Sequence, residues 1–107
     1  MKHTTIMMKT TFKEEGKDLV MYFEGRLDTS AAAQTEREMQ VLYNCDGHDI
    51  ILDCTQLEYI SSSGLRLFLS LLKAAKPKGS HVYITGMNDN LRQVFAMTGF
   101  TNLFEFK

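Results

Sequence analysis

The sequence predicts an α/β fold in which a mixed β-sheet is covered by about three to four helices. Two strand-like segments come first, and helix, strand, helix, strand and helix then alternate; crossover helices connect parallel strands, so the later strands should run parallel. The apolar run within residues 49–53 does not alternate with polar residues, which is typical of a central strand buried on both faces. The 107 residues are 44% hydrophobic, enough for one core, so we expect one compact domain over residues 1–107.

The first two strands are expected at residues 4–13 and 18–24. Residues 14–17, with the sequence Glu-Glu-Gly-Lys, form a polar, glycine-containing connection between them. A connection of this length and composition favours a β-hairpin. The two strands should therefore pair antiparallel.

A first helix is expected to begin around Asp28, Thr29 and Ser30, whose side-chain oxygens can accept hydrogen bonds from the free N–H groups of a helix start. Less polar residues then recur at the spacing of one helical face, and residues 44–47 end the helix. The face consists of Ala32, Thr35, Met39 and Leu42.

A second helix is expected at residues 65–73, after a strand at residues 49–53 and a loop at residues 54–60. Its apolar residues cover more than half of the helix circumference, which is wider than contact with one sheet requires. Residues 76–79, Lys-Pro-Lys-Gly, supply the cations, proline and glycine that end a helix.

The remaining elements complete the alternation. Residues 81–85 predict a strand, and Asn88 can cap a last helix that closes at Gly99. The tail at residues 100–107, which contains Leu103, Phe104 and Phe106, should dock back on the core.

The composition argues against several functional classes. The chain has twelve Lys and Arg residues and thirteen Asp and Glu residues, so its net charge is −1. No run of like-charged residues is long enough to bind nucleic acid or an anionic membrane. The N-terminus lacks the apolar run of a signal peptide, and the longest apolar stretch, residues 65–72, is far too short to span a bilayer. We therefore expect a cytoplasmic protein without direct membrane insertion.

The cysteines and histidines give no metal or cofactor motif. Cys45 and Cys54 have no CxxC partner, so two free thiols are expected. The histidines at positions 3, 48 and 81 are far apart in the sequence, and no glycine-rich phosphate loop is present. We expect neither a metal nor a cofactor.

Catalysis is not indicated either. A nucleophilic serine needs a base within hydrogen-bond reach, and the run Ser61-Ser62-Ser63-Gly64 is not the Gly-x-Ser-x-Gly turn of hydrolases. Asp28 and Asp53 could form a carboxylate pair, but hydrogen bonds to helix-start N–H groups explain both more simply. No catalytic residue is assigned, and a small serine hydrolase ranks far behind the other hypotheses.

The serine run is the candidate functional site. Loops that follow parallel strands lie at one edge of the sheet, so Asp28, Asp53 and the serines are expected there together. One serine would be enough to cap a helix, whereas three beside a very apolar helix favour an exposed docking surface. A phosphate on such a serine adds a charge of about −1.5 to −2 and could switch docking off.

Several short motifs along the chain resemble those of the STAS domain family, which contains sulfate-transporter tails and bacterial anti-sigma-factor antagonists. The order of the motifs and of the elements between them matches over nearly the whole chain. The matching segments are Gly25-Arg26-Leu27-Asp28, Leu52-Asp53-Cys54-Thr55, Tyr59-Ile60-Ser61-Ser62-Ser63-Gly64-Leu65, and Val94-Phe95-Ala96-Met97-Thr98-Gly99-Phe100 with Leu103-Phe104.

The resemblance implies an antagonist that binds an anti-sigma factor with serine kinase activity and is released when that kinase phosphorylates it. In the family the acceptor follows an Asp in an Asp-Ser-Ser/Thr-Gly pattern, which places it at Ser62. Ser61 stands where the family has Asp, so Ser61 and Ser63 remain alternative acceptors. The implied partner-binding edge consists of Asp28, Ser61, Ser63, Gly64, Leu65 and Arg66.

The family also implies an alternative of a different class. Some similar STAS proteins are non-catalytic subunits that regulate the ATPase of a membrane transporter. Such a subunit would bind a nucleotide-binding protein and would not respond to serine phosphorylation.

Overall fold

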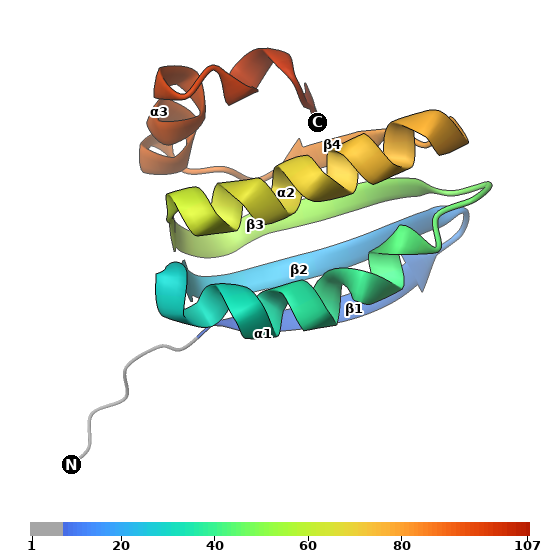
Figure 1. Ribbon diagram of the computed structural model, residues 1–107, viewed down its shortest axis with the longest axis horizontal. Helices are drawn as coiled ribbons and strands as arrows, with labels where there is room; N and C mark the ends of the chain where they lie inside the picture. Colours follow the sequence, from blue (N-terminus) through green and yellow to red (C-terminus); the bar gives the residue numbers. More distant parts are fainter. Residues whose placement is uncertain (1–7) are drawn as a thin grey trace.

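The computed structural model describes residues 8–107, and Figure 1 shows helices lying across a twisted sheet. The sheet has five strands, ordered by their position in the sequence. The strands are β1 (Lys9–Glu15), β2 (Asp18–Leu27), β3 (Asp49–Ile60), β4 (Val82–Thr85) and β5 (Glu105–Phe106). The α-helices are α1 (Thr29–Met39), α2 (Ser62–Ala75) and α3 (Asp89–Met97), and short 3₁₀ turns follow them at Gln40–Tyr43, Lys76–Lys78 and Phe100–Asn102.

The sheet is mixed, as the sequence predicts. β1 and β2 pair antiparallel through a tight turn at Gly16, whose φ of 63° lies in the left-handed region that glycine adopts without strain. The pairs β2–β3, β3–β4 and β4–β5 are all parallel. The predicted α/β fold class is confirmed.

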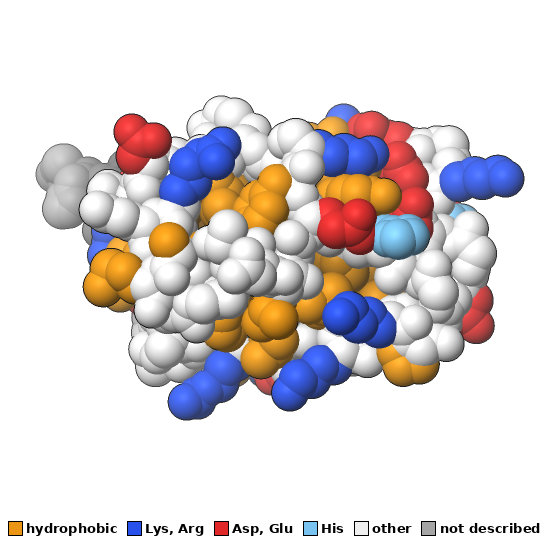
Figure 2. All heavy atoms as spheres, turned by 90° about the horizontal axis from the view of Figure 1, so that it is seen from above, with side chains coloured by type: hydrophobic (Ala, Val, Ile, Leu, Met, Phe, Trp, Pro, Cys, Tyr) orange, Lys and Arg blue, Asp and Glu red, His pale blue; other side chains and the backbone are white. Residues whose placement is uncertain are grey.

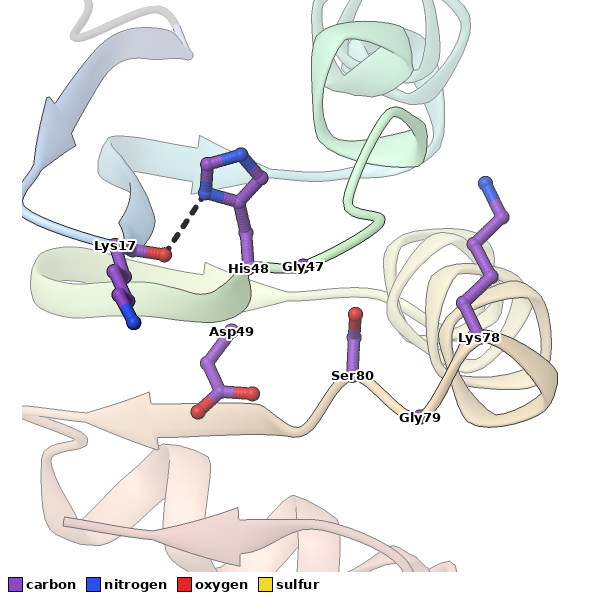
Figure 3. A pocket seen from close by; sticks show the side chains of 7 residues that line it. All are labelled: Lys17, Gly47, His48, Asp49, Lys78, Gly79 and Ser80. Carbon is purple, nitrogen blue, oxygen red and sulfur yellow. Dashed lines mark hydrogen bonds between the residues drawn. The ribbon is translucent and has the colours of Figure 1, made fainter.

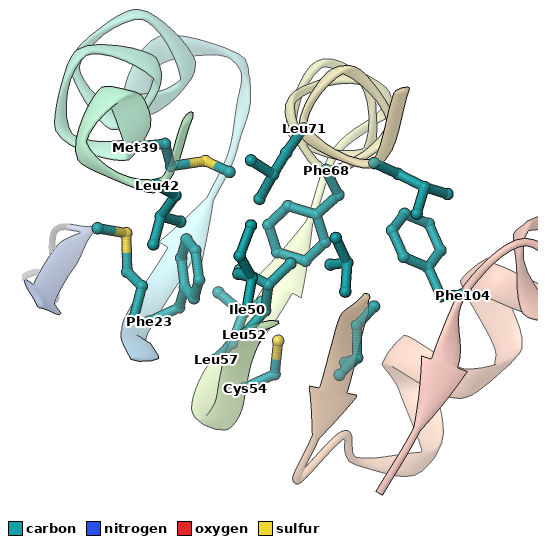
Figure 4. Packing of buried hydrophobic residues seen from close by; sticks show 14 of the residues in the cluster. Phe23, Met39, Leu42, Ile50, Leu52, Cys54, Leu57, Phe68, Leu71 and Phe104 are labelled. Carbon is teal, nitrogen blue, oxygen red and sulfur yellow. The ribbon is translucent and has the colours of Figure 1, made fainter. Parts of the chain in front are cut away.

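The three crossovers explain which face of the sheet is covered. The connections β2–α1–β3, β3–α2–β4 and β4–α3–β5 all step in the same direction across the sheet. Because such crossovers are right-handed, helices that step in one direction lie on the same face. In Figure 1, α1 and α2 both lie in front of the strands, and Figure 4 shows Met39 and Leu71 pointing from the helices toward Ile50.

This arrangement corrects the prediction for the central strand. β3 does lie in the middle of the sheet, and Ile50 and Leu52 are fully buried beneath the helices. Ile51 and Asp53 alternate with them and are only half-buried on the opposite face. The prediction that this strand is buried on both faces is therefore wrong, because the helices cover one face.

Strand β3 is also longer than predicted. It continues through residues 54–60, where the sequence predicts a loop, and β2 likewise continues past residue 24 to Leu27. The register between them shifts between Tyr22 and Glu24 and again between Gly25 and Arg26. These irregularities bury Leu57 and Ile60 at a spacing of three residues, which hides the two-residue period of a strand.

The broad apolar surface of α2 is used mostly inside the fold. Its Phe68 ring lies 5.2 Å from that of Phe23 in the sheet and 6.4 Å from that of Phe95 in α3, measured between centroids. Leu67 and Leu69 are half-buried and also pack against the core. The width of this apolar surface therefore reflects packing between neighbouring elements, so it does not itself indicate a docking surface.

The N-terminal strand differs in detail from the prediction, whereas the C-terminal tail agrees with it. The first strand begins at Lys9 and includes Glu14 and Glu15, whereas the part of the predicted strand at residues 4–7 lies outside the described residues. The C-terminal tail docks on the core as expected, with the rings of Phe104 and Phe106 at 5.9 and 6.4 Å from that of Phe95. Within residues 8–107, no helix is long and apolar enough to cross a membrane.

Candidate functional site

The ends of β2 and β3 place the first predicted site residues side by side. Leu27 and Ile60 are paired across the two strands, and the backbone N–H of Ser61 donates to the carbonyl of Leu27 at 2.8 Å. Asp28 and Ser61 therefore leave neighbouring strands at the same edge of the sheet. The predicted association of Asp28 with the serine run is present in the structure.

Asp28 is the N-cap of α1. Its Oδ1 accepts hydrogen bonds from the Ser30 hydroxyl at 2.8 Å and from the backbone N–H of Ala31 at 3.0 Å. These two hydrogen bonds, in that order of size, hold the pKa of the Asp28 carboxyl below its usual value. The simpler interpretation of Asp28 as a helix cap is confirmed.

Ser61 has the same role in α2. Its Oγ accepts from the backbone N–H of Gly64 at 3.2 Å, and its carbonyl accepts from the N–H of Leu65 at 2.9 Å. The residue is only 8% exposed. Because its hydroxyl is buried and engaged in capping, Ser61 is poorly placed to accept a phosphate.

Ser62 is the residue of the run that faces solvent. It is the first residue of α2 and is exposed, whereas Ser63 is half-buried. A kinase needs access to the hydroxyl it modifies, so exposure ranks Ser62 above its two neighbours.

Gly64 allows α2 to approach the strands closely. A Cβ atom at this position would lie 2.7 Å from Cγ of Leu27 and 2.8 Å from Cγ1 of Ile60, closer than real contacts allow. Absence of a side chain is thus what lets the start of α2 sit directly on the ends of β2 and β3.

The other predicted contact residues are divided between core and surface. Leu65, which the resemblance places on the partner-binding edge, is 3% exposed, and its side chain packs in the core. Gly64 is also buried, and it supports the edge from beneath. Arg66 is exposed on the first turns of α2.

Asp53 does not belong to this site. It lies within β3, paired with Tyr22 on one side and Thr85 on the other, and its Oδ1 accepts from the N–H of Thr55 at 3.0 Å. The prediction fails because β3 continues beyond Asp53 to Ile60, so the strand end and the Asp are far apart along the strand. No carboxylate pair forms with Asp28.

The sequence analysis missed one pair of side chains at this edge. The guanidinium of Arg26 lies 4.4 Å from the ring centroid of Tyr59, on strands that pair Arg26 with Tyr59 directly. Tyr59 is 39% exposed. The sequence analysis missed this pair because it predicted a loop at residues 54–60. A prediction that extended both strands to the serines would have placed Arg26 opposite Tyr59.

The structure has a hollow of about 250 Å³ at the opposite end of β3 from the serines (Figure 3). His48 Nδ1 donates to the carbonyl of Lys17 at 3.0 Å, and the Ser80 hydroxyl donates to the carbonyl of Cys45 at 2.7 Å. The hollow lies beside Asp49, the first residue of β3, whereas the serines follow the last residue of β3, so the hollow is separate from the serine edge. Its lining residues are Lys17, Gly47, His48, Asp49, Lys78, Gly79 and Ser80.

The described residues give no sign of a metal site, and the face drawn in Figure 2 gives no sign of a nucleic-acid-binding surface. Within residues 8–107, no three His, Cys, Asp or Glu side chains are grouped so that they could hold a metal ion. Figure 2, seen from the side of α3 and the C-terminal tail, shows Lys and Arg side chains separated from one another. This face therefore has no continuous basic surface of the kind that binds nucleic acid.

Comparison with known proteins identifies the family. Residues 9–107 match the model of the STAS domain, so the chain belongs to the STAS domain family. It is 26% identical over 96 residues to the anti-sigma-B factor antagonist of Listeria monocytogenes, covering 89% of this chain and 84% of that protein. STAS domains and anti-sigma factor antagonists are non-catalytic regulators, which confirms the prediction that the chain is not an enzyme.

Solved structures show the same fold. An anti-sigma factor antagonist from Mycobacterium paratuberculosis superposes with a TM-score of 0.78 at 19% identity, covering 94% of this chain and 85% of that one. The Bacillus cell fate determinant SpoIIAA, solved in its phosphorylated form, superposes with a TM-score of 0.70 at 18% identity, covering 92% and 91%.

Proposed function

We propose that this chain is an anti-sigma factor antagonist that binds an anti-sigma factor with serine kinase activity and is released when Ser62 is phosphorylated. The observation that carries the proposal is the exposure of Ser62 at the start of α2, beside two serines that are buried or half-buried. The similarity to the antagonist of Listeria monocytogenes supports the choice of partner. This role requires the chain to be cytoplasmic.

The docking edge in this proposal consists of the side chains that surround Ser62 and face solvent. Asp28 is half-buried on one side, and Arg66 is exposed on the other. The stacked pair of Arg26 and Tyr59 extends the edge onto the open face of the sheet. Ser61, Gly64 and Leu65 hold this edge in position from within the fold.

A phosphate on Ser62 would prevent docking through charge and desolvation. It adds a charge of about −1.5 to −2 at a position that the partner must cover. If modification costs about 3 kcal/mol of binding free energy, affinity falls more than a hundredfold. The fold itself can tolerate the charge, because the N-terminus of a helix stabilises anions.

The test is the affinity of the cognate kinase for three variants, measured by calorimetry. Ser62→Ala should bind like the wild type but resist release by ATP, and Ser62→Asp should bind more than a hundredfold more weakly. Ser70→Asp is the matched control, because Ser70 is exposed on the same helix away from its start. Equal binding by the wild type and Ser62→Asp would refute the proposal.

The transporter alternative predicts a different pattern. A regulatory STAS subunit would co-purify with a nucleotide-binding ATPase subunit, and Ser62→Asp would leave that association unchanged. A phosphopeptide map from the native cells separates the two, because a modified serine within residues 57–65 is expected only for the antagonist.

A further inference from the structure

The residue one helical turn beyond Ser62 is Arg66, which has no side-chain partner among residues 8–107. Side chains four positions apart on a helix are neighbours on the same face, so Arg66 lies beside Ser62. Both side chains are exposed. Within residues 8–107, the Arg66 guanidinium makes no hydrogen bond, ion pair or stacking contact, whereas Arg37 bonds to Gln34 and Arg26 stacks on Tyr59.

The charges around Ser62 favour an anion there. Ser61 caps the helix with a neutral hydroxyl, so the residue before Ser62 brings no carboxylate. The Asp28 carboxylate is held by hydrogen bonds to Ser30 and Ala31 at the start of its own helix. A phosphate at Ser62 would therefore meet a free guanidinium one turn away, with Asp28 the only acidic side chain of the predicted edge.

We propose that Arg66 binds the phosphate of modified Ser62 within the same helix. This inference rests on the proposed function only in taking Ser62 as the acceptor. A guanidinium presents parallel N–H donors that match two phosphate oxygens, and charge-assisted hydrogen bonds of this kind are strong. Arg66 is a positioning residue here, because it fixes the phosphate on the helix.

The pairing gives phosphorylation a second effect on docking. In the unmodified chain Arg66 is an exposed cation available to a partner. In the modified chain its guanidinium is occupied by the phosphate. One modification thus adds a negative charge to the docking edge and removes a positive one.

The test uses protein with phosphoserine installed at position 62 during synthesis, so that no kinase is needed. The second pKa of the phosphate is read from ³¹P chemical shifts, and Arg66→Gln should raise it by about 0.3, the value expected for a helical pair four residues apart. Arg66→Lys should restore part of the difference, because it keeps the charge and loses the bidentate geometry. In the same samples, the Arg66 Nε–H signal should shift on modification.

Arg92→Gln is the matched control, because Arg92 is an exposed helical arginine on α3. An unchanged phosphate pKa in Arg66→Gln, or an equal change in Arg92→Gln, would overturn the inference. Its failure is distinguishable from failure of the proposed function, which is decided by kinase binding to Ser62→Asp and not by the phosphate titration.

Discussion

Replacement of Gly64 by alanine tests the packing that holds the serine edge together. The Cβ atom added by Gly64→Ala would lie 2.7 Å from Cγ of Leu27 and 2.8 Å from Cγ1 of Ile60. Both neighbours are buried at the ends of strands, so neither can move aside without disturbing the core. Because Gly64 has no positive φ, backbone strain makes no contribution, and the clash alone opposes the substitution.

The magnitude follows from two opposing effects. Alanine is the better helix former by up to about 1 kcal/mol, which favours the variant. Overpacking of a well-packed site costs about 1–3 kcal/mol, and two contacts this short place Gly64→Ala at the upper end of that range. The net loss should be about 2 kcal/mol, which lowers Tm by about 10 °C in a domain of this size.

Thermal unfolding followed by circular dichroism measures this loss. Ser70→Ala on the exposed side of α2 is the control and should be neutral or slightly stabilising, because it gains helix propensity without a clash. Leu27→Ala removes most of the clashing atoms, so the double variant should lose less than the sum of the two single losses. A Tm for Gly64→Ala at or above that of the wild type would refute the packing argument.

Three further predictions concern the cap, the tail and the core. Ser61→Ala removes the acceptor for the Gly64 N–H and should lower the free energy of unfolding, measured in urea, by about 1 kcal/mol. Ser61→Asp should keep the cap and most of that stability. Equal losses of stability in the two variants would argue against capping. Hydrogen bonding to Glu105 at 2.6 Å raises the pKa of His81 above 6.5, so the stabilisation from this pair is complete below the unfolded pKa and is lost as pH rises through the folded pKa. Tm should therefore decline slightly above pH 6.5, and Glu105→Gln should flatten that decline; a decline of the same size in the variant would exclude the pair as its cause. Burial raises the pKa of the Cys54 thiol and shields it from reagents. Thiol reagents should therefore label Cys54 in urea but scarcely in the native protein. Rapid labelling of the native protein would contradict a closed core.

The capped helices and the parallel crossovers were predictable because their signals are local. Asp28 and Asn88 mark the starts of α1 and α3, and each accepts the backbone N–H three residues later. The order of the elements then determines the direction of the strands and places Asp28 near the serines. These features need only short-range rules and the handedness of crossovers.

The features that were not predictable depend on contacts between distant segments. The extension of β3 to Ile60 is stabilised by pairing with β2 through a shifted register, and nothing in residues 54–60 alone shows it. The same extension removes Asp53 from the site and brings Tyr59 to Arg26. The two-residue strand β5 likewise exists only through its pairing with β4.

Ser61 caps α2 without adding a charge, whereas an aspartate at this position would both cap the helix and place a negative charge beside Ser62. Both residue types cap a helix by accepting the N–H three residues on, and Ser61 does so toward Gly64. The fold of the edge is therefore insensitive to the exchange, but the charge beside Ser62 is not. With a neutral cap and with Arg66 unpaired among residues 8–107 one turn away, a phosphate on Ser62 would meet less repulsion within its own chain than it would beside an aspartate. Under the proposed function, the barrier to docking of the phosphorylated chain would then come mainly from the partner, which would have to cover the added charge.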